Sequence, residues 1–313
     1  MNEIITATGS GYLVEQGGFS SDLFESWISF IDAKPKTVET YTRAIKQFIY
    51  YLQDNSIKNP TRADILAYRD SLQADHKPTT VQSYLMAVKQ FFKWTAQEGL
   101  YPNIADNIKS AKLDKGFKKD YLTSKQVKKL LGTIDQSTLK GLRDYAILSL
   151  MVTTGLRTVE VERANIEDLR TVADFTALFI QGKGHLEKTE YVKVEEPVEN
   201  AIRAYLKARG KAGEQEPLFA SIAHRNTGGR MSTRSISRIA KENMIEADLN
   251  SERLTAHSLR HTTATLNLLN GGTPEETMQL LRHANLNTTL IYSHALERAK
   301  NQSEARVTKA IFG

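Results

Sequence analysis

The stretch His283-Ala-Asn-Leu-Asn-Thr-Thr-Leu-Ile-Tyr292 follows the stretch His257-Ser-Leu-Arg260-His261-Thr262 in this chain of 313 residues. Together they place one tyrosine phenol close in sequence to several histidines and an arginine. An arginine within Thr154-Gly155-Leu156-Arg157 and a lysine within Gly182-Lys183-Gly184 complete a set of cations. Guanidinium and imidazolium groups can meet the negative charge of phosphate oxygens, so cations grouped around a tyrosine suit attack on a phosphodiester.

The spacing of these residues indicates one shared site. His257 and Arg260 are three residues apart, so they share a face at the start of a helix, whose N-terminus would also favour a phosphate. His283 and Tyr292 are separated by about two and a half helical turns and would point to opposite sides of one unbroken helix. We therefore predict a break at Asn285-Leu-Asn-Thr-Thr, with a new helix from Thr288 or Thr289 that turns Tyr292 back towards His283.

The composition sets broad limits on the class of protein. The chain is 40% hydrophobic and 25% charged, and its length suggests about two domains. The absence of cysteine excludes disulfides, thiolate metal sites and a cysteine nucleophile. A net charge of +6 permits a polyanion partner without demanding one. We expect a cytoplasmic protein with no membrane partner, because no apolar run is long enough to span a bilayer and the first residues lack a basic signal region.

The first half of the chain predicts an arm, a helical unit and a linker. Residues 1–18 are glycine-rich without a clear period and are interpreted as a flexible arm. Residues 19–108 show apolar residues at three- and four-residue steps, which predicts a compact four-helix unit. Thr61 and Asp64 predict a capping box at the start of one of these helices. Residues 109–121 contain five lysines and are interpreted as a basic linker. This linker is either a solvated connector or a strap across a phosphate backbone, whose affinity would fall with salt.

The second half, residues 122–313, is expected to be a mainly helical unit with one small antiparallel sheet. Strand patterns occur at Ala177-Leu-Phe-Ile180 and Tyr191-Val-Lys-Val194, on either side of the Gly-Lys-Gly turn. The overall fold class is therefore mainly α with a small β-sheet, in an α+β arrangement. Helices are predicted at Leu142 to Met151, Val198 to Arg209, Thr233 to Ile245, Ser258 to Leu269, Pro274 to Leu281 and Thr289 to Arg298.

Other interpretations of the same residues stay open at this point. His257 and His261 could bind a metal together with His283, but Ser258 stands where a His-Glu-x-x-His zinc motif has glutamate, so no metal is expected. A tyrosine near the end of a chain is more often a core or surface residue than a nucleophile. Glu160 is interpreted as structural, pairing with Arg157 or with a backbone amide.

The order of these motifs resembles the tyrosine recombinase (phage integrase) family over about residues 19 to 300. The series is Thr-Gly-Leu-Arg-x-x-Glu, Gly-Lys-Gly between strands, His-x-Leu-Arg-His-Thr, and Leu-Leu-x-His-Ala-Asn-x-x-Thr-Thr-x-x-Tyr. The resemblance implies an N-terminal core-DNA-binding (SAM-like) domain and a C-terminal catalytic domain that clamp duplex DNA. The layout is similar to compact Xer-type and mobile-element integrases, which implies a site-specific recombinase for DNA integration, excision or resolution.

The resemblance also implies a role for each candidate residue. Tyr292 attacks the scissile phosphate and forms a 3′-phosphotyrosyl intermediate. Arg157 and Arg260 hold the non-bridging oxygens, and His283 donates a hydrogen bond to the same phosphate. His257 assists proton transfer, and Lys183 protonates the departing 5′-oxygen, with Lys188 in reserve. The covalent link stores the phosphodiester energy, so neither a metal, nor ATP, nor another cofactor is expected.

One residue departs from the family pattern. Glycine is usual before the second motif histidine, and Arg282 stands there. We expect its side chain to contact DNA or to point to solvent, without touching the catalytic set.

The resemblance further implies partners. The amphipathic tail of residues 296–313 would dock on a neighbouring subunit, in a homo-tetramer that holds two DNA duplexes. An accessory recombinase or excision factor and association with the nucleoid are also expected. Two alternatives belong to other classes: a DNA-binding protein that has lost strand transfer, and a single-subunit type IB topoisomerase.

Overall fold

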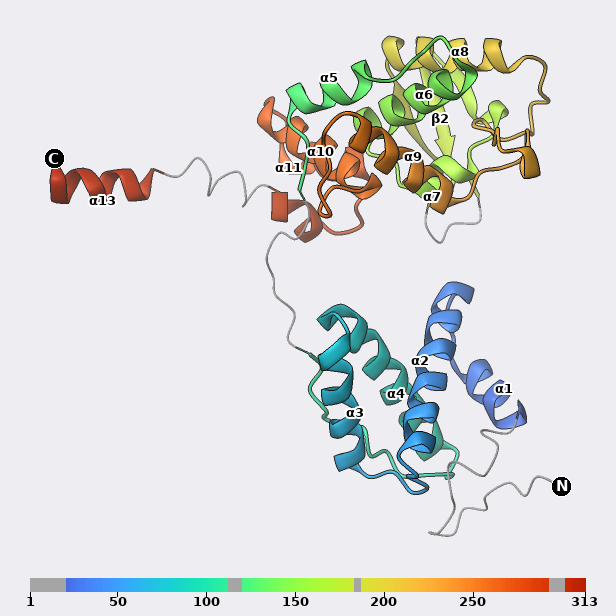
Figure 1. Cartoon of the computed structure of the whole chain (residues 1–313), viewed down its shortest axis with the longest axis vertical. Coiled ribbons are helices and arrows are strands. Elements are labelled where there is room, and N and C mark those ends of the chain that lie inside the picture. The colour runs from blue at the N-terminus through green and yellow to red at the C-terminus, as the bar shows by residue number, and fades with distance from the viewer. Residues whose placement is uncertain (1–20, 112–119, 183–186, 293–301) are drawn as a thin grey trace. The chain divides into compact units, whose positions relative to one another are not determined.

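The computed structural model describes residues 21–111, 120–182, 187–292 and 302–313. The predicted arm, most of the predicted linker, Lys183 and part of the predicted tail lie outside the described residues. The chain divides into two compact units, Met1–Lys115 and Gly116–Gly313, which are described separately (Figure 1). The boundaries placed at residues 108 and 122 stay predictions. No helix within the described ranges combines the length and the apolar character needed to cross a membrane.

The first unit is built from helices with short connections, as the periodicity predicts. In the described residues they are α1 (Ser21–Phe30), α2 (Pro35–Asp54), α3 (Arg62–Asp75) and α4 (Pro78–Gln97). Proline opens both α2 and α4, where its missing N–H is not needed. The capping box predicted from Thr61 and Asp64 is confirmed, because the Thr61 amide donates to Asp64 at 2.7 Å.

The core of the first unit is rich in aromatic side chains. Trp27, Phe48, Tyr68 and Phe92 are almost completely buried. The rings of Phe48 and Tyr68 meet edge to face with their centroids 5.0 Å apart, a favourable arrangement for aromatic pairs. This core holds α2 and α4 side by side (Figure 1).

The second unit confirms the predicted fold class, with helices around one small sheet. Its elements before the sheet are α5 (Ser124–Gly132), α6 (Leu139–Thr154), α7 (Thr158–Arg163) and the 3-10 turn Ile166–Asp168. The sheet comprises β1 (Leu169–Val172), β2 (Phe175–Ile180) and β3 (Glu190–Val194). After it come α8 (Glu196–Arg209), the 3-10 turn His224–Asn226, α9 (Thr233–Glu246), α10 (Ala256–Leu269), α11 (Pro274–Leu281) and α13 (Ser303–Phe312). Residues 287–292 are also helical. The short helix α7 is an element that periodicity did not predict.

The sheet and helix α6 fix the position of the site. The strands are antiparallel in the order β1-β2-β3, with Leu178 opposite Val192. Helix α6 is buried along most of its length and packs against α8 and α10 (Figure 1). It ends at Gly155, whose φ of 64° is a left-handed conformation. A Cβ atom at Gly155 would lie only 2.4 Å from Cδ2 of Leu281 in α11, so a larger residue would force this buried side chain to shift in addition to straining the backbone.

Candidate active site

Arg157 lies directly after the Gly155 turn, where it caps helix α7. Its backbone N–H donates to Oε2 of Glu160 at 2.7 Å, and its Nη1 donates to Oε1 at 2.9 Å. The Glu160 side chain is fully buried, whereas the Arg157 side chain keeps 30% of its surface exposed. This arrangement confirms the structural interpretation of Glu160. Glu160 therefore fixes Arg157 through its backbone and its Nη1, while part of the Arg157 side chain stays exposed and could meet a ligand.

Arg260 is a buried cation in the first turns of α10. Its Nη1 donates to the carbonyl of Gly155 at 2.5 Å, and its Nη2 donates to the carbonyl of Leu281. These bonds join α10 to the ends of α6 and α11. Burial, followed by repulsion from Arg157 and Arg282, lowers the pKa of Arg260 to about 9. The side chain therefore stays positive at neutral pH, and solvent screens its charge little because only 2% of the residue is exposed.

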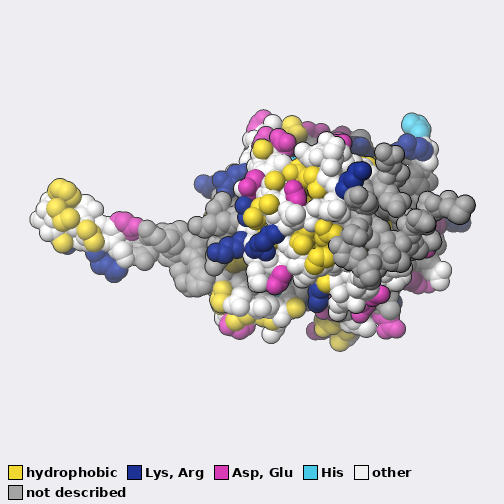
Figure 2. Space-filling view, turned by 90° about the horizontal axis from the view of Figure 1, so that it is seen from below, with side chains coloured by type: hydrophobic (Ala, Val, Ile, Leu, Met, Phe, Trp, Pro, Cys, Tyr) yellow, Lys and Arg dark blue, Asp and Glu magenta, His cyan; other side chains and the backbone are white. Residues whose placement is uncertain are grey.

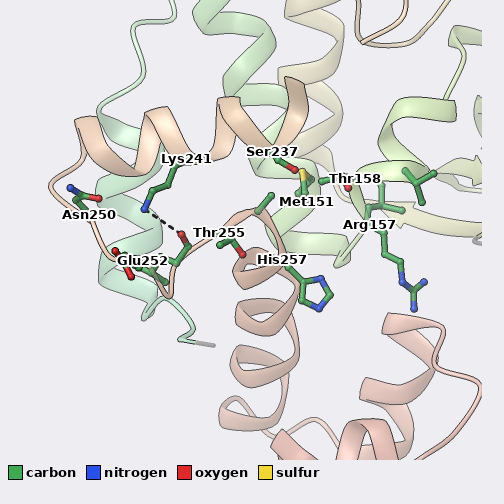
Figure 3. Close-up of a pocket in the computed structure, with 13 residues that line it drawn as sticks. Met151, Arg157, Thr158, Ser237, Lys241, Asn250, Glu252, Thr255 and His257 are labelled. Atoms are coloured by element: carbon green, nitrogen blue, oxygen red, sulfur yellow. Dashed lines mark hydrogen bonds between the residues drawn. The ribbon is translucent and has the colours of Figure 1, made fainter. Parts of the chain in front are cut away.

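His257 lies at the start of α10 and is exposed, three residues before the buried Arg260. It borders a pocket of about 780 Å³ together with Arg157. In Figure 3, Arg157 and His257 lie on one side of this pocket, and Lys241, Asn250 and Glu252 lie on the other. The ring of His257 also meets the ring of His261 edge to face, with centroids 4.7 Å apart. The pocket thus opens beside two of the predicted catalytic residues.

The predicted break between His283 and Tyr292 is confirmed. Helix α11 ends at Leu281, Arg282 adopts a left-handed backbone, and the chain becomes helical again at residues 287–292. Nδ1 of His283 lies 2.8 Å from the hydroxyl of Thr289, in the new helix. Burial, followed by repulsion from Arg260 and Arg157, lowers the pKa of His283 to about 4. His283 is therefore neutral at physiological pH.

The low pKa of His283 predicts how stability depends on pH. An unfolded histidine titrates near 6.5, so between about pH 6.5 and 4 the unfolded chain binds a proton that the folded chain does not. The free energy of unfolding should consequently fall as the pH falls through this window. Replacement of His283 by glutamine should flatten that fall, as measured by urea unfolding of both proteins at several pH values. Parallel curves of unfolding free energy against pH for the two proteins would contradict the lowered pKa of His283.

Tyr292 is buried next to His261. Its side chain is 5% exposed, and its hydroxyl lies 2.6 Å from Nδ1 of His261. The two rings are also in contact, with centroids 5.2 Å apart. Burial raises the pKa of the Tyr292 phenol, while the charges of Arg260 and Arg157 act in the opposite direction. The helix break thus returns Tyr292 to the region of the histidines, where its hydroxyl contacts His261, a residue outside the predicted catalytic set.

The predicted lysine of the site is Lys183, and Lys188 is the reserve candidate. Lys183 lies outside the described residues, although the carbonyl of the preceding Gly182 accepts a hydrogen bond from Arg163 at 3.3 Å. Nζ of Lys188, the reserve candidate, lies 2.5 Å from the carboxylate of the buried Asp168. This ion pair holds the Lys188 ammonium at a buried carboxylate.

One of the two expectations for the Arg282 side chain was wrong. The side chain does not point to solvent, because only 9% of it is exposed, and its Nη2 lies 3.0 Å from Oε2 of Glu160, a residue outside the predicted catalytic set. Glu160 is also the partner of Arg157. Sequence reasoning missed this contact and that of His261 with Tyr292. The second left a signal, since His261 follows His257 by one helical turn.

The described candidate residues therefore come together. The charges of Arg260, Arg157, Arg282 and His257 all act on His283, and those of Arg260 and Arg157 act on Tyr292. Among the described residues, no group of three or more histidine, cysteine, aspartate or glutamate side chains is placed to hold a metal ion.

The chain is similar to known proteins over nearly its whole length. Family models match residues 120–298 as "Phage integrase family" and residues 22–100 as "Phage integrase, N-terminal SAM-like domain". It is 32% identical over 271 residues to the tyrosine recombinase XerC of Myxococcus xanthus, covering 83% of this chain and 87% of that protein. It is 36% identical over 175 residues to XerC of Caldanaerobacter subterraneus, covering 56% of this chain but only 47% of that protein.

Solved structures share the fold. The XerH site-specific recombinase bound to a palindromic difH substrate, in a post-cleavage complex, superposes with a TM-score of 0.71. It is 22% identical, and the match covers 90% of this chain and 83% of that one. The lambda integrase tetramer bound to a Holliday junction superposes with a TM-score of 0.68 at 19% identity, covering 87% of this chain and 75% of that one.

Proposed function

Because this chain belongs to the phage integrase family and is a site-specific tyrosine recombinase, we propose that Tyr292 cuts DNA by attacking the scissile phosphate. The phenol oxygen forms a bond to phosphorus while the bond from phosphorus to the 5′-oxygen breaks. The products are a 3′-phosphotyrosyl enzyme and a free 5′-hydroxyl. Attack by a 5′-hydroxyl reverses the step and rejoins the strand, so the phosphodiester energy is kept and neither ATP nor a metal is required.

The proposal rests on the groups that surround the Tyr292 hydroxyl. Burial raises the pKa of the phenol overall, while the charges of Arg260 and Arg157 act against this rise and favour the phenolate. The hydroxyl already lies 2.6 Å from a ring nitrogen of His261. The two arginines would also hold the non-bridging oxygens, as planar groups that always carry charge. The neutral His283 would donate a hydrogen bond to the phosphate, and the exposed His257 would assist proton transfer.

Lys183 is proposed as the acid that protonates the leaving 5′-oxygen. Replacement of Lys183 by alanine should slow cleavage of ordinary DNA strongly, by about 10²–10⁴-fold. It should slow cleavage far less when sulfur replaces the bridging 5′-oxygen, because a thiolate leaves without a proton. Cleavage rates on the two substrates, with Lys188→Ala as the matched control, decide this point. Equal slowing on both substrates would show that Lys183 is not the acid.

The first unit is proposed to grip the DNA together with the second, as a clamp. A pocket of about 440 Å³ on α2 and α4 supports this role, since it is lined by Arg43, Lys46, Gln47, Tyr50 and Tyr84, among others. The cations of this pocket could contact DNA phosphates, and the exposed ring of Tyr50 could contact the DNA beside them. The lysines of the predicted linker, residues 109–121, would add contacts that weaken as salt rises.

A homo-tetramer on two duplexes is proposed as the active assembly. Recombination cuts both strands of two duplexes, so four active sites must meet, and a ring of head-to-tail contacts satisfies this need. Helix α13 supports such a contact, because Val307, Ile311 and Phe312 are 58%, 65% and 83% exposed. Figure 2 shows hydrophobic side chains gathered on α13, at the far left of the view. A helix of this kind can bury its apolar face on a neighbouring subunit.

The experiment that tests the function compares recombination with relaxation. A supercoiled plasmid carrying two cognate sites should give recombinant circles, whereas a plasmid without a site should remain supercoiled. Relaxation of both plasmids without recombinants would favour the topoisomerase alternative, and binding without any cleavage would favour the DNA-binding alternative. We also propose that the protein acts on the nucleoid in the cytoplasm, in integration, excision or resolution, with an accessory recombinase or excision factor.

A further inference from the structure

Arg282 occupies a backbone position that side chains rarely adopt. It caps helix α11 with φ of 53° and ψ of 50°, in the left-handed region that glycine enters most easily. An arginine here is held against its backbone preference, so the side chain must make contacts that glycine could not.

The contacts of Arg282 are made in the interior of the unit. Its Nη1 donates to the carbonyl of Leu280 at 2.8 Å, and its Nη2 lies 3.0 Å from Oε2 of Glu160. The side chain is 9% exposed, and its buried Nε has no hydrogen-bond partner among the residues that the structure describes. A cation so deeply buried is tolerated when it is paired with an opposite charge, and here the pair is with Glu160.

Glu160 is shared between two arginines. Its Oε2 accepts from the backbone N–H of Arg157 at 2.7 Å and from Arg282 at 3.0 Å. Its Oε1 accepts from Nη1 of Arg157 at 2.9 Å. With Arg282 absent, the carboxylate would be fixed from the Arg157 side alone and could turn. With Arg282 present, the Glu160 carboxylate is held in one orientation. The Arg157 guanidinium that bonds to this carboxylate is therefore oriented as well.

We propose that Arg282 is a positioning residue that orients Arg157 through Glu160 and ties Arg157 to the neighbouring His283. The bridge joins the start of α7 to the end of α11, two segments that are 122 residues apart in sequence. Arg282 thus acts on the scissile phosphate through Arg157 and not by touching it. The inference rests on the proposed function, since it assumes that Arg157 meets the phosphate.

The test is replacement of Arg282 by glycine, which suits the left-handed backbone and removes the bridge. Single-turnover adduct formation is measured on a nicked suicide substrate and on the same DNA with a neutral methylphosphonate at the scissile position. We expect Arg282→Gly to slow the reaction on ordinary phosphate by about 10- to 100-fold, the size of a misplaced catalytic group. Slowing on the methylphosphonate should be much smaller, because that substrate lacks the charge that Arg157 meets.

Two further variants make the result decisive. Ala173→Gly is the matched control, because Ala173 is exposed and also has a positive φ, 52°, but makes no ion pair there. It should react like the wild type. If Arg282→Gly does not fold, Arg282→Asn takes its place, because asparagine tolerates the left-handed backbone. Arg282→Asn should then show the slowing expected of Arg282→Gly. Wild-type rates for a folded Arg282 variant, or equal slowing on both substrates, would overturn the positioning role.

The proposed function is checked separately in the same assay. If Tyr292→Phe still forms the adduct, the proposed nucleophile is wrong whatever the Arg282 variants do. If Tyr292→Phe forms none and Arg282→Gly reacts like the wild type, only the positioning role is lost.

Discussion

Replacement of Tyr292 by phenylalanine is expected to abolish covalent attachment to DNA, a loss of about 10⁴-fold or more, as for other removed nucleophiles. The ring would keep its place in the cluster with Ala264 and Leu281, so the fold should survive. Loss of the hydrogen bond to His261 should lower the free energy of unfolding by only about 1 kcal/mol. The measurement is adduct formation on a nicked suicide substrate under denaturing electrophoresis.

DNA binding serves as the control for this variant. Tyr292→Phe should shift a duplex that carries the recombination site at nearly the wild-type protein concentration, since the missing hydroxyl is one contact among many. Tyr191→Phe is a matched variant on β3, where the ring is 49% exposed, and it should cleave normally. Loss of binding together with cleavage in Tyr292→Phe would point to a structural role for this tyrosine.

Replacement of Arg260 by glutamine is expected to lower both the cleavage rate and the stability of the fold. Removing one charged donor from the reacting phosphate should lower the cleavage rate by about 10²–10³-fold. The carbonyls of Gly155 and Leu281 would also lose their donor. Buried groups left without a partner cost about 1–3 kcal/mol, whereas relief of repulsion from Arg157 and Arg282 acts in the opposite direction. We therefore expect a drop in the unfolding free energy towards the lower end of that range.

Losing Arg260 should lower both the unfolding free energy and the cleavage rate. Urea unfolding measures the first, and single-turnover cleavage measures the second. Arg203→Gln on α8 is the matched control, because the Arg203 side chain is 60% exposed and its ion pair with Glu199 lies at the surface. That variant should change neither quantity appreciably. Cleavage by Arg260→Gln within about threefold of the wild type would exclude Arg260 as a phosphate ligand.

The local features of the fold could be predicted because they depend on residues close in sequence. The periodicity of apolar residues predicted most helices, and Thr61 with Asp64 predicted a cap that the structure contains. The break before Tyr292 followed from the incompatibility of a nine-residue spacing with one helical face. The interpretation of Glu160 was also local, since its partner Arg157 lies three residues away.

The contacts that were missed join residues distant in sequence. His261 and Tyr292 are 31 residues apart, and Arg282 and Glu160 are 122 residues apart. The first contact depends on how α10 packs against the helix of residues 287–292, and the second on how α7 lies against the end of α11. No local pattern specifies either arrangement. Helix α7 has only six residues, too few for a helical period to appear. For Arg282, the left-handed backbone at the end of α11 explains why glycine suits this position, but the inward direction of the side chain became clear only in the folded chain.

The most direct measurement is the identity of the residue that becomes linked to DNA. The wild-type protein is trapped on a nicked suicide substrate, the DNA is trimmed with nuclease, and the protein is digested for mass spectrometry. The peptide that carries a 3′-phosphonucleotide should contain Tyr292, with the modification on the phenol oxygen. A modification on any other residue, or recombination without a covalent intermediate, would contradict the account.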